Sequence, residues 1–207
     1  REFITGLEPR NSFNTSYNYP VNFVIESSYL IHGIGLVVSG FLEGGVIKIG
    51  DQLSLGPYYG KFYKIVIKCI HNNFREYVDE IPAGCSGCFN IKTNEKKFQL
   101  KKKVLKRGMI MLDANSDDHT YMEFKAKVKI LHHPTTIKQN YETMIHCGTI
   151  KQVAKIISIE KELLRTGDQS NVIFRFKRKP EFIQKDKQII FREGKTKGIG
   201  VVTELVK

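Results

Sequence analysis

Residues 191–203 (FREGKTKGIGVVT) carry residue types that bind phosphate in many proteins. The Gly-Lys-Thr triplet at 194–196 matches the end of a P-loop, which holds phosphates with backbone N–H groups and a lysine. A P-loop also needs a glycine five positions before its Gly-Lys pair and a helix after it. Position 189 is Ile, and the residues after the triplet are glycine-rich and β-branched. The segment is therefore predicted to be a β-hairpin with a basic turn.

Cysteine and histidine residues suggest a second chemistry, the binding of a metal ion. Cys85 and Cys88 have the spacing of zinc ligands, and four other residues are candidates to complete a site: Cys69, His71, His146 and Cys147. A second correctly spaced pair is missing, and such cysteines usually fill small buried spaces, so no metal is expected. His132 and His133 precede Pro134, where they more often shape a turn than act as a base. No spacing suggests a catalytic constellation, so no catalytic residue is expected.

The charge balance points to a polyanionic partner. The chain has 33 Lys and Arg against 21 Asp and Glu, a net charge of +12, and this favours RNA, DNA or anionic lipid. Two sets of cations could follow a nucleic-acid backbone. The first set (Lys96, Lys97, Lys101, Lys102, Lys103, Lys106 and Arg107) is explained equally well as a solvated loop, and the second (Lys125, Lys127 and Lys129) better as the outer face of a strand.

Strand-like alternation dominates the chain, and helical periodicity is scarcely visible. Apolar residues alternate with lysines over 124–130, and the segments 62–70 and 172–177 behave similarly. Short apolar runs lie between closely spaced glycines over 33–50. Many short strands separated by turns are typical of barrels or sandwiches, so the fold is expected to be all-β.

The domain organisation follows from two polar segments. The acidic run 113–119 separates two strand-rich halves and is the expected domain boundary. The expected domains are small β-units at 18–115 and 119–207, and residues 1–17 are a polar, turn-prone lead-in or linker. Because the chain begins with Arg1, we expect it to be a piece of a longer protein.

The sequence gives two indications of compartment. No apolar run approaches the roughly 20 residues that cross a bilayer, so no membrane partner is expected. Four cysteines without a secretory leader suggest reduced thiols in a cytoplasmic protein.

The order of several motifs resembles that of translational GTPases. Segments 29–40 (YLIHGIGLVVSG) and 45–51 (GVIKIGD) are similar to the opening of the second domain of these proteins. Segments 164–168 (LRTGD) and 191–203 are similar to the third domain of elongation factor Tu and elongation factor 1-alpha. Two segments, 131–137 (LHHPTTI) and 144–150 (MIHCGTI), resemble the GTP-binding protein 1 family most closely, and segments 55–57, 68–71 and 107–109 are similar to it too.

This resemblance implies a GTPase domain followed by two consecutive β-barrels, of which the chain corresponds to the barrels alone. The P-loop and the guanine-reading Asn-Lys-x-Asp motif are absent. No cofactor is therefore expected in this chain, whereas GTP and Mg²⁺ are expected in the full-length protein. In elongation factor Tu the second domain holds the aminoacyl end of the tRNA and touches the small ribosomal subunit, and the third grips the T-stem. The implied partners are aminoacyl-tRNA, small-subunit ribosomal RNA and the GTPase domain in cis.

The resemblance also carries over individual residues. The T-stem contacts that it implies are Arg192, Glu193, Gly194, Lys195, Thr196 and Lys197. The aminoacyl-end pocket is matched by Tyr29, Asn72, Arg75 and Ser86, although Tyr29 stands at a Phe position, Ser86 at an Asn position and Asn72 at a Glu position. Tyr141 matches a Tyr of the third domain, but its neighbour Glu142 replaces an Arg.

The alternative is a protein-interaction module of such a GTPase. Its main partner would be a guanine nucleotide exchange factor or an RNA-decay factor, and its basic charge would give only weak, non-specific attraction to RNA.

Overall fold

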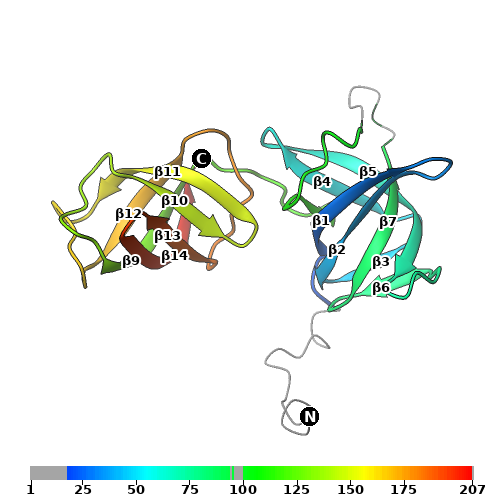
Figure 1. The fold of residues 1–207 in the computed structure, drawn as a ribbon, viewed down its shortest axis with the longest axis horizontal. Helices are drawn as coiled ribbons and strands as arrows, with labels where there is room; N and C mark the ends of the chain where they lie inside the picture. Colours follow the sequence, from blue (N-terminus) through cyan, green and yellow to red (C-terminus); the bar gives the residue numbers. More distant parts are fainter. Residues whose placement is uncertain (1–17, 94, 96–99, 207) are drawn as a thin grey trace, which may run out of the picture. The chain divides into compact units, whose positions relative to one another are not determined.

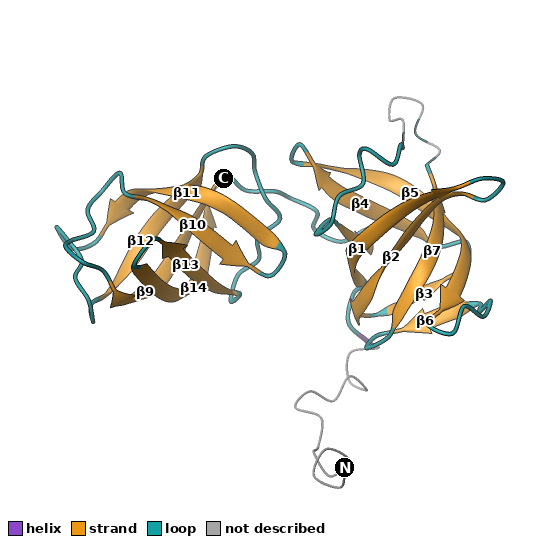
Figure 2. Cartoon of the chain, in the orientation of Figure 1, coloured by secondary structure: helices purple, strands orange, loops and turns teal. Residues whose placement is uncertain are grey.

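The computed structural model describes residues 18–93, 95 and 100–206, and these contain two closed β-barrels (Figures 1 and 2). Every regular element in the described ranges is a strand, which confirms the expected all-β fold. The lead-in at 1–17 lies outside the described residues and stays a prediction. The chain divides into two compact units between Ser116 and Asp117, and the short segment Pro57–Phe62 groups with the second unit. In the part of the chain that is described, no helix is long and apolar enough to cross a membrane.

The first barrel has the strand order β1-β2-β7-β5-β4-β8 and closes through pairing of β8 with β1. Its strands are β1 (Asn22–Ile31), β2 (Gly35–Gly44), β4 (Gln52–Tyr58), β5 (Lys61–Asn72), β7 (Ser86–Lys92) and β8 (Ile110–Asp113). A separate two-stranded sheet joins β3 (Val46–Lys48) and β6 (Glu80–Pro82). The core is filled by inward-pointing alternate residues, among which Phe23 and Phe89 pack edge to face with ring centroids 4.8 Å apart.

The second barrel has the strand order β10-β11-β12-β9-β14-β13 and closes through pairing of β13 with β10. Its strands are β9 (Glu123–His132), β10 (Glu142–Cys147), β11 (Ile150–Ile159), β12 (Gln169–Phe176), β13 (Gln188–Glu193) and β14 (Thr196–Val206). The alternation predicted over 124–130 is confirmed, since Phe124, Ala126, Val128 and Ile130 are buried within β9. Phe124 stacks on Phe174 at 5.4 Å in the core.

Gly198 on β14 makes room for the aromatic core of the second barrel. Phe191 on β13 is its cross-strand partner and is buried. A Cβ atom added at Gly198 would lie 1.9 Å from Cζ of the Phe191 ring. The ring therefore covers the glycine, an arrangement that fixes the register between β13 and β14.

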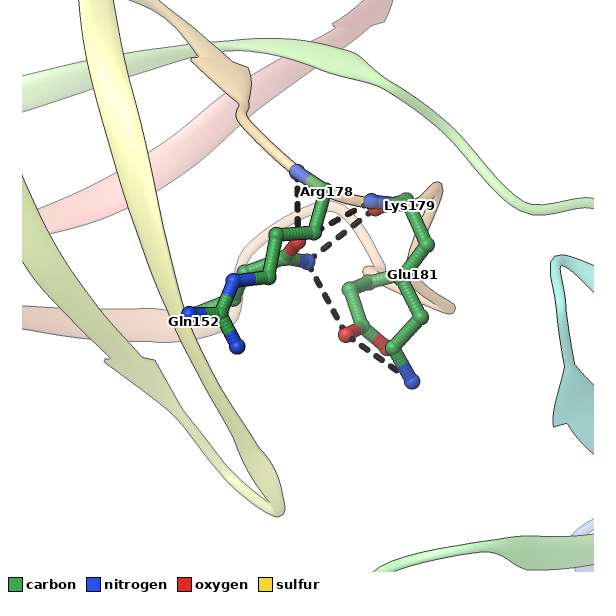
Figure 3. A network of polar contacts seen from close by, with 4 residues as sticks. All are labelled: Gln152, Arg178, Lys179 and Glu181. Atoms are coloured by element: carbon green, nitrogen blue, oxygen red, sulfur yellow. Dashed lines mark hydrogen bonds and ion pairs between the residues drawn. The ribbon is translucent and has the colours of Figure 1, made fainter.

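A buried polar network ties the loop after β12 to the barrel wall (Figure 3). Nε2 of Gln152, on β11, donates to the carbonyl of Lys179 and to Oε1 of Glu181, both at 3.0 Å. Oε1 of Gln152 accepts from the backbone N–H groups of Arg178 at 2.9 Å and Lys179 at 3.0 Å. Burial raises the pKa of the Glu181 carboxyl, and the Lys179 ammonium 3.4 Å away opposes part of this rise.

Substituting Gly198→Ala should lower the free energy of unfolding by about 1–3 kcal/mol, because the added methyl overpacks the Phe191 ring. Urea unfolding followed by circular dichroism measures this loss. Phe191→Leu in the Gly198→Ala background should recover part of the loss by vacating the ring position. An unchanged urea midpoint in the single variant would show that the ring moves aside freely.

Glu181→Gln should flatten the pH dependence of stability. Because its pKa in the folded state lies above the ordinary value of 4.5, Glu181 holds its proton more tightly when folded. The unfolding free energy of the parent protein therefore falls as pH rises from about 4.5 through the folded-state pKa. Gln keeps an acceptor for Gln152 but does not titrate, so the variant should gain stability relative to the parent as pH rises. Urea unfolding between pH 4 and 7 checks this, and parallel profiles would contradict it.

Candidate nucleic-acid interface

The Gly-Lys-Thr triplet lies in the hairpin between β13 and β14, as the sequence predicts. Glu193 pairs with Thr196 and closes a two-residue loop of Gly194 and Lys195. Gly194 has a φ of +53°, and glycine in the first position is a common solution for such tight loops. Strand β14 follows the triplet directly, so the structure excludes the P-loop alternative, which requires a helix there.

The hairpin places two cations directly opposite each other. Arg192 on β13 and Lys197 on β14 are cross-strand partners, and both are exposed. Lys197 also pairs with the exposed His132 on β9, so three basic residues form a row across three strands. Lys195 adds a further exposed cation at the tip. Like charges directly opposite each other destabilise a sheet, so Arg192 and Lys197 repel each other across the strands.

Several other cations of the second barrel are paired with carboxylates. Lys177 lies 2.7 Å from Glu142, Lys161 lies 3.6 Å from Asp168, and Arg175 pairs with Glu123. Within the described ranges, Arg192, Lys195 and Lys197 form no ion pair. These three hairpin cations thus lack the carboxylate partner that Lys161, Arg175 and Lys177 have.

The lysines of β9 divide into two kinds. Lys125 is the cross-strand partner of Glu204, so a carboxylate faces it. Lys127 and Lys129 are exposed and lie opposite the uncharged Val201 and Ile199 of β14. This placement of Lys127 and Lys129 is compatible both with an ordinary outward strand face and with a contact to nucleic acid.

Thr196 differs from its neighbours because its side chain points inward and is only 3% exposed. Its hydroxyl lies 2.7 Å from Nδ1 of His133 and 3.0 Å from the hydroxyl of Tyr141. The Thr196 side chain is therefore occupied inside the protein, and any part that it takes in binding RNA is indirect. The contact of this hydroxyl with an RNA backbone stays a prediction.

In the first barrel, three of the four residues assigned to the aminoacyl-end pocket lie close together. Asn72 is the cross-strand partner of Gly87, next to Ser86, and the N–H of Arg75 donates to the Asn72 carbonyl at 3.0 Å. Tyr29 instead pairs with Val37 of β2, and Val37 pairs with Asn90 of β7. Asn90 lies three residues beyond Gly87 along β7, which is about 10 Å at about 3.3 Å per residue. The roles of all four residues stay predictions.

The Asn72 side chain organises the turn after β5. Its Oδ1 accepts from the N–H groups of Phe74 at 2.9 Å and Glu76 at 3.0 Å, and its Nδ2 donates to the Glu76 carboxylate at 2.8 Å. Arg75 within this turn has a φ of +66°. The turn leaves Phe74 82% exposed, and it occupies Oδ1 and one of the two side-chain N–H donors of Asn72.

The cysteine and histidine residues form no cluster suited to a metal in the residues that the structure describes. Sγ of Cys69 contacts Nδ1 of His71 at 3.6 Å. Burial raises the pKa of the Cys88 and Cys147 thiols, which keeps both protonated and weakly reactive. These side chains therefore pack as small apolar groups.

The lysine-rich segment before β8 is attached to the first barrel. Val104 and Leu105 are buried, and Lys101, Lys102 and Lys103 are exposed beside them. Lys106 and Arg107 are exposed as well, whereas Lys96 and Lys97 lie outside the described residues. The segment thus presents its cations to solvent.

Sequence reasoning missed the contacts of His133 and Tyr141 with Thr196. These residues lie 55 and more positions apart, and no periodicity links them. The cap formed by Asn72 has a local signal, because Asn commonly bonds to backbone groups two residues ahead in turns.

Comparison with known proteins finds relatives that are named GTP-binding proteins and elongation factors. No protein-family model matches the chain. GTP-binding protein 1 of Xenopus laevis is 38% identical over 206 residues, which is 99% of this chain and 30% of that protein. GTP-binding protein 2 of Homo sapiens is 31% identical over 88% of this chain and 30% of that protein. Elongation factor 1-alpha of Methanocella arvoryzae is 29% identical over 90% of this chain and 47% of that protein. The chain therefore spans less than half the length of these relatives.

Asn72→Ala should loosen the turn at 72–77, because it removes the acceptor of two backbone N–H groups. Asn72→Asp keeps this acceptor but replaces the Nδ2 donor with a carboxylate oxygen that repels the Glu76 carboxylate, so it should retain part of the turn. Hydrogen exchange of the Phe74 and Glu76 amides measures the difference, which should be about fivefold or more in rate for the Ala variant. Equal exchange in both variants would show that the backbone alone holds the turn.

Proposed function

The chain is homologous over nearly its whole length to GTP-binding protein 1, and over most of it to elongation factor 1-alpha, and we propose that it is the RNA-binding, two-barrel part of a translational GTPase. The GTP-binding domain, with GTP and Mg²⁺, lies outside this chain in the proposal, on its N-terminal side. The barrels bind aminoacyl-tRNA and contact small-subunit ribosomal RNA in the cytoplasm. The names of the relatives and the two-barrel fold support this assignment.

One observation carries the RNA-binding part of the proposal, the opposed and unpaired cations of the hairpin. Arg192 faces Lys197 across the strands, and Lys195 stands at the tip. Each phosphate of an RNA backbone supplies the anion that this arrangement lacks, and the release of counterions from RNA adds to the affinity. Contacts of this kind set the position of the RNA without reading its sequence.

In this proposal the first barrel binds the acceptor end of the tRNA. Arg75 and Ser86 line the end pocket, Asn72 shapes its turn, and Tyr29 contacts the RNA farther along the barrel. Because Asn72 is held by Glu76 and by two backbone N–H groups, its contribution is to present Arg75.

A second candidate function is protein interaction, and a particular surface favours it. Ile190 and Ile199 are cross-strand partners on the outer face of the second barrel, exposed at 55% and 43%, and Val201 beside them is exposed at 39%. Exposed apolar residues at neighbouring positions suit a protein partner such as an exchange factor or an RNA-decay factor. Competition of labelled aminoacyl-tRNA with uncharged tRNA and with an unrelated RNA duplex separates the two functions. If the chain binds all three RNAs equally well, the result favours protein interaction as the main function.

Substituting both Lys195→Gln and Lys197→Gln should weaken tRNA binding and reduce its salt dependence. The slope of log K against log salt should fall by about 1 to 2 units, at about 0.7 to 0.9 per lost phosphate contact. Filter-binding titration over a range of salt concentrations measures both quantities.

Lys185→Gln with Lys187→Gln provides a matched control. These exposed lysines have the same spacing and precede β13, whereas the hairpin follows it. The control removes the same charge and should leave the slope nearly unchanged. Equal losses of tRNA affinity and slope in the two double variants would show that the hairpin lysines act only through the general positive charge of the barrel. An unchanged slope in the hairpin variant would overturn the proposed function.

A further inference from the structure

Three polar side chains meet at the base of the basic hairpin. Oγ1 of Thr196 lies 2.7 Å from Nδ1 of His133 and 3.0 Å from the Tyr141 hydroxyl. The rings of His133 and Tyr141 pack edge to face with centroids 5.4 Å apart. The three residues come from β14, the end of β9 and the start of β10, so the cluster joins the hairpin to two separate segments of the barrel. We call this cluster the hairpin latch.

When the His133 imidazole carries a single proton, all hydrogen bonds of the latch form with one consistent assignment of donors and acceptors. With its proton on Nε2, His133 donates to Oγ1 of Thr135, 3.3 Å away. Its Nδ1 then accepts from the Thr196 hydroxyl, whose oxygen accepts in turn from the Tyr141 hydroxyl. Each hydroxyl is used once as a donor, and the Thr196 oxygen also accepts. Such a chain orients each member more firmly than a single hydrogen bond.

The latch extends to a second turn through the backbone of His133. The His133 N–H donates to Oγ1 of Thr166 at 2.9 Å, and the same hydroxyl donates to the His133 carbonyl at 3.2 Å. Thr166 lies in the turn 164–168. In this turn the Gly167 N–H donates to the Ile130 carbonyl, and the Asp168 carbonyl accepts from the Ile130 N–H near the end of β9. Three segments distant in sequence, 133–141, 164–168 and 194–197, are therefore held by one set of hydrogen bonds.

Side-chain packing adds little support at the end of the hairpin, where the remaining support is backbone pairing of Arg192 with Met144 and of Lys197 with His132. Among residues 192–197, only Thr196 is buried. A Cβ added at Gly194 would meet no atom within 4 Å, so nothing packs against the loop on that side. Arg192 and Lys197 meanwhile repel each other across the strands. Thr196 is thus the one residue of 192–197 whose side chain is anchored in the barrel.

We propose that His133 is a positioning residue which, through Thr196 and together with Tyr141, fixes the basic hairpin in the geometry that binds an RNA backbone. This inference rests on the proposed function, since His133 would support the hairpin to which that function assigns RNA binding. His133 itself makes no contact with RNA. Its imidazole holds Thr196, and Thr196 holds the end of the hairpin on which Arg192, Lys195 and Lys197 stand.

Thr196→Val tests the latch without changing charge or the β-branched shape of the side chain. Hydrogen exchange of the 192–197 amides should accelerate, and affinity for a tRNA should fall about threefold to tenfold. The slope of log K against log salt should fall as well, although no charge has been removed. A purely structural role would lower the melting temperature and leave affinity and slope of the folded protein unchanged.

Further variants sharpen this test. Thr203→Val removes another hydroxyl of β14, which donates to the Lys125 carbonyl at 3.2 Å far from the hairpin, and it should leave RNA binding unchanged. His133→Leu should resemble Thr196→Val. His133→Asn keeps a hydrogen-bonding group near the position of Nδ1 and should restore part of the affinity. Equal losses in the Leu and Asn variants would overturn the positioning role of His133.

The experiment separates this inference from the proposed function. If the Lys195→Gln and Lys197→Gln double variant loses affinity while Thr196→Val does not, the positioning role is overturned and the RNA site stands. If the lysine double variant binds tRNA normally, the proposed function is overturned and the positioning role for RNA falls with it. Losses in both, with faster exchange confined to the hairpin in Thr196→Val, support both.

Discussion

Cross-strand register in the second barrel is the constraint on which its other features depend. Strand β14 pairs with β13 on one side and with β9 on the other, so a single alignment decides which of its residues face the core. A shift by one residue would exchange the buried and exposed sets. The Phe191 ring over Gly198 fixes this alignment from inside. The same alignment sets Arg192 against Lys197 on the outside, so the packing of the core determines the pattern of charge on the surface.

The second barrel distributes its charges unevenly, and this separates stability from binding. Glu123, Glu142 and Asp168 each neutralise a nearby cation. Exposed pairs of this kind contribute little to stability individually, but they leave no net charge where they occur. The hairpin has the opposite character, because two cations face each other without a carboxylate. Proteins commonly retain such locally unfavourable arrangements where a ligand relieves them.

Local patterns predicted the strands and the hairpin but not the contacts between distant segments. The alternation around Phe124 and the apolar residues flanking Gly194 follow from the period of a strand, which the sequence displays directly. The placement of Tyr29 relative to Ser86 depends on pairing across β2 and β7, and the pairing of β7 with β5 contains a register shift between Ile67 and Cys69 of β5. The partnership of His133 with Thr196 arises only when the barrel closes, so no local spacing announces it.

Closure of each barrel has a consequence for how such a chain combines with other domains. In both barrels the first and last strands of the sheet pair with each other, β1 with β8 over Asn22–Val24 and β10 with β13 over Met144–His146. Within the described residues, each barrel sheet is therefore closed and lacks a terminal strand that is unpaired along its whole length. Each can therefore be joined to new sequence at its ends, duplicated or exchanged as a self-contained part. The surface loops can then diverge in their ligands while the hydrogen-bonded frame beneath them is inherited unchanged.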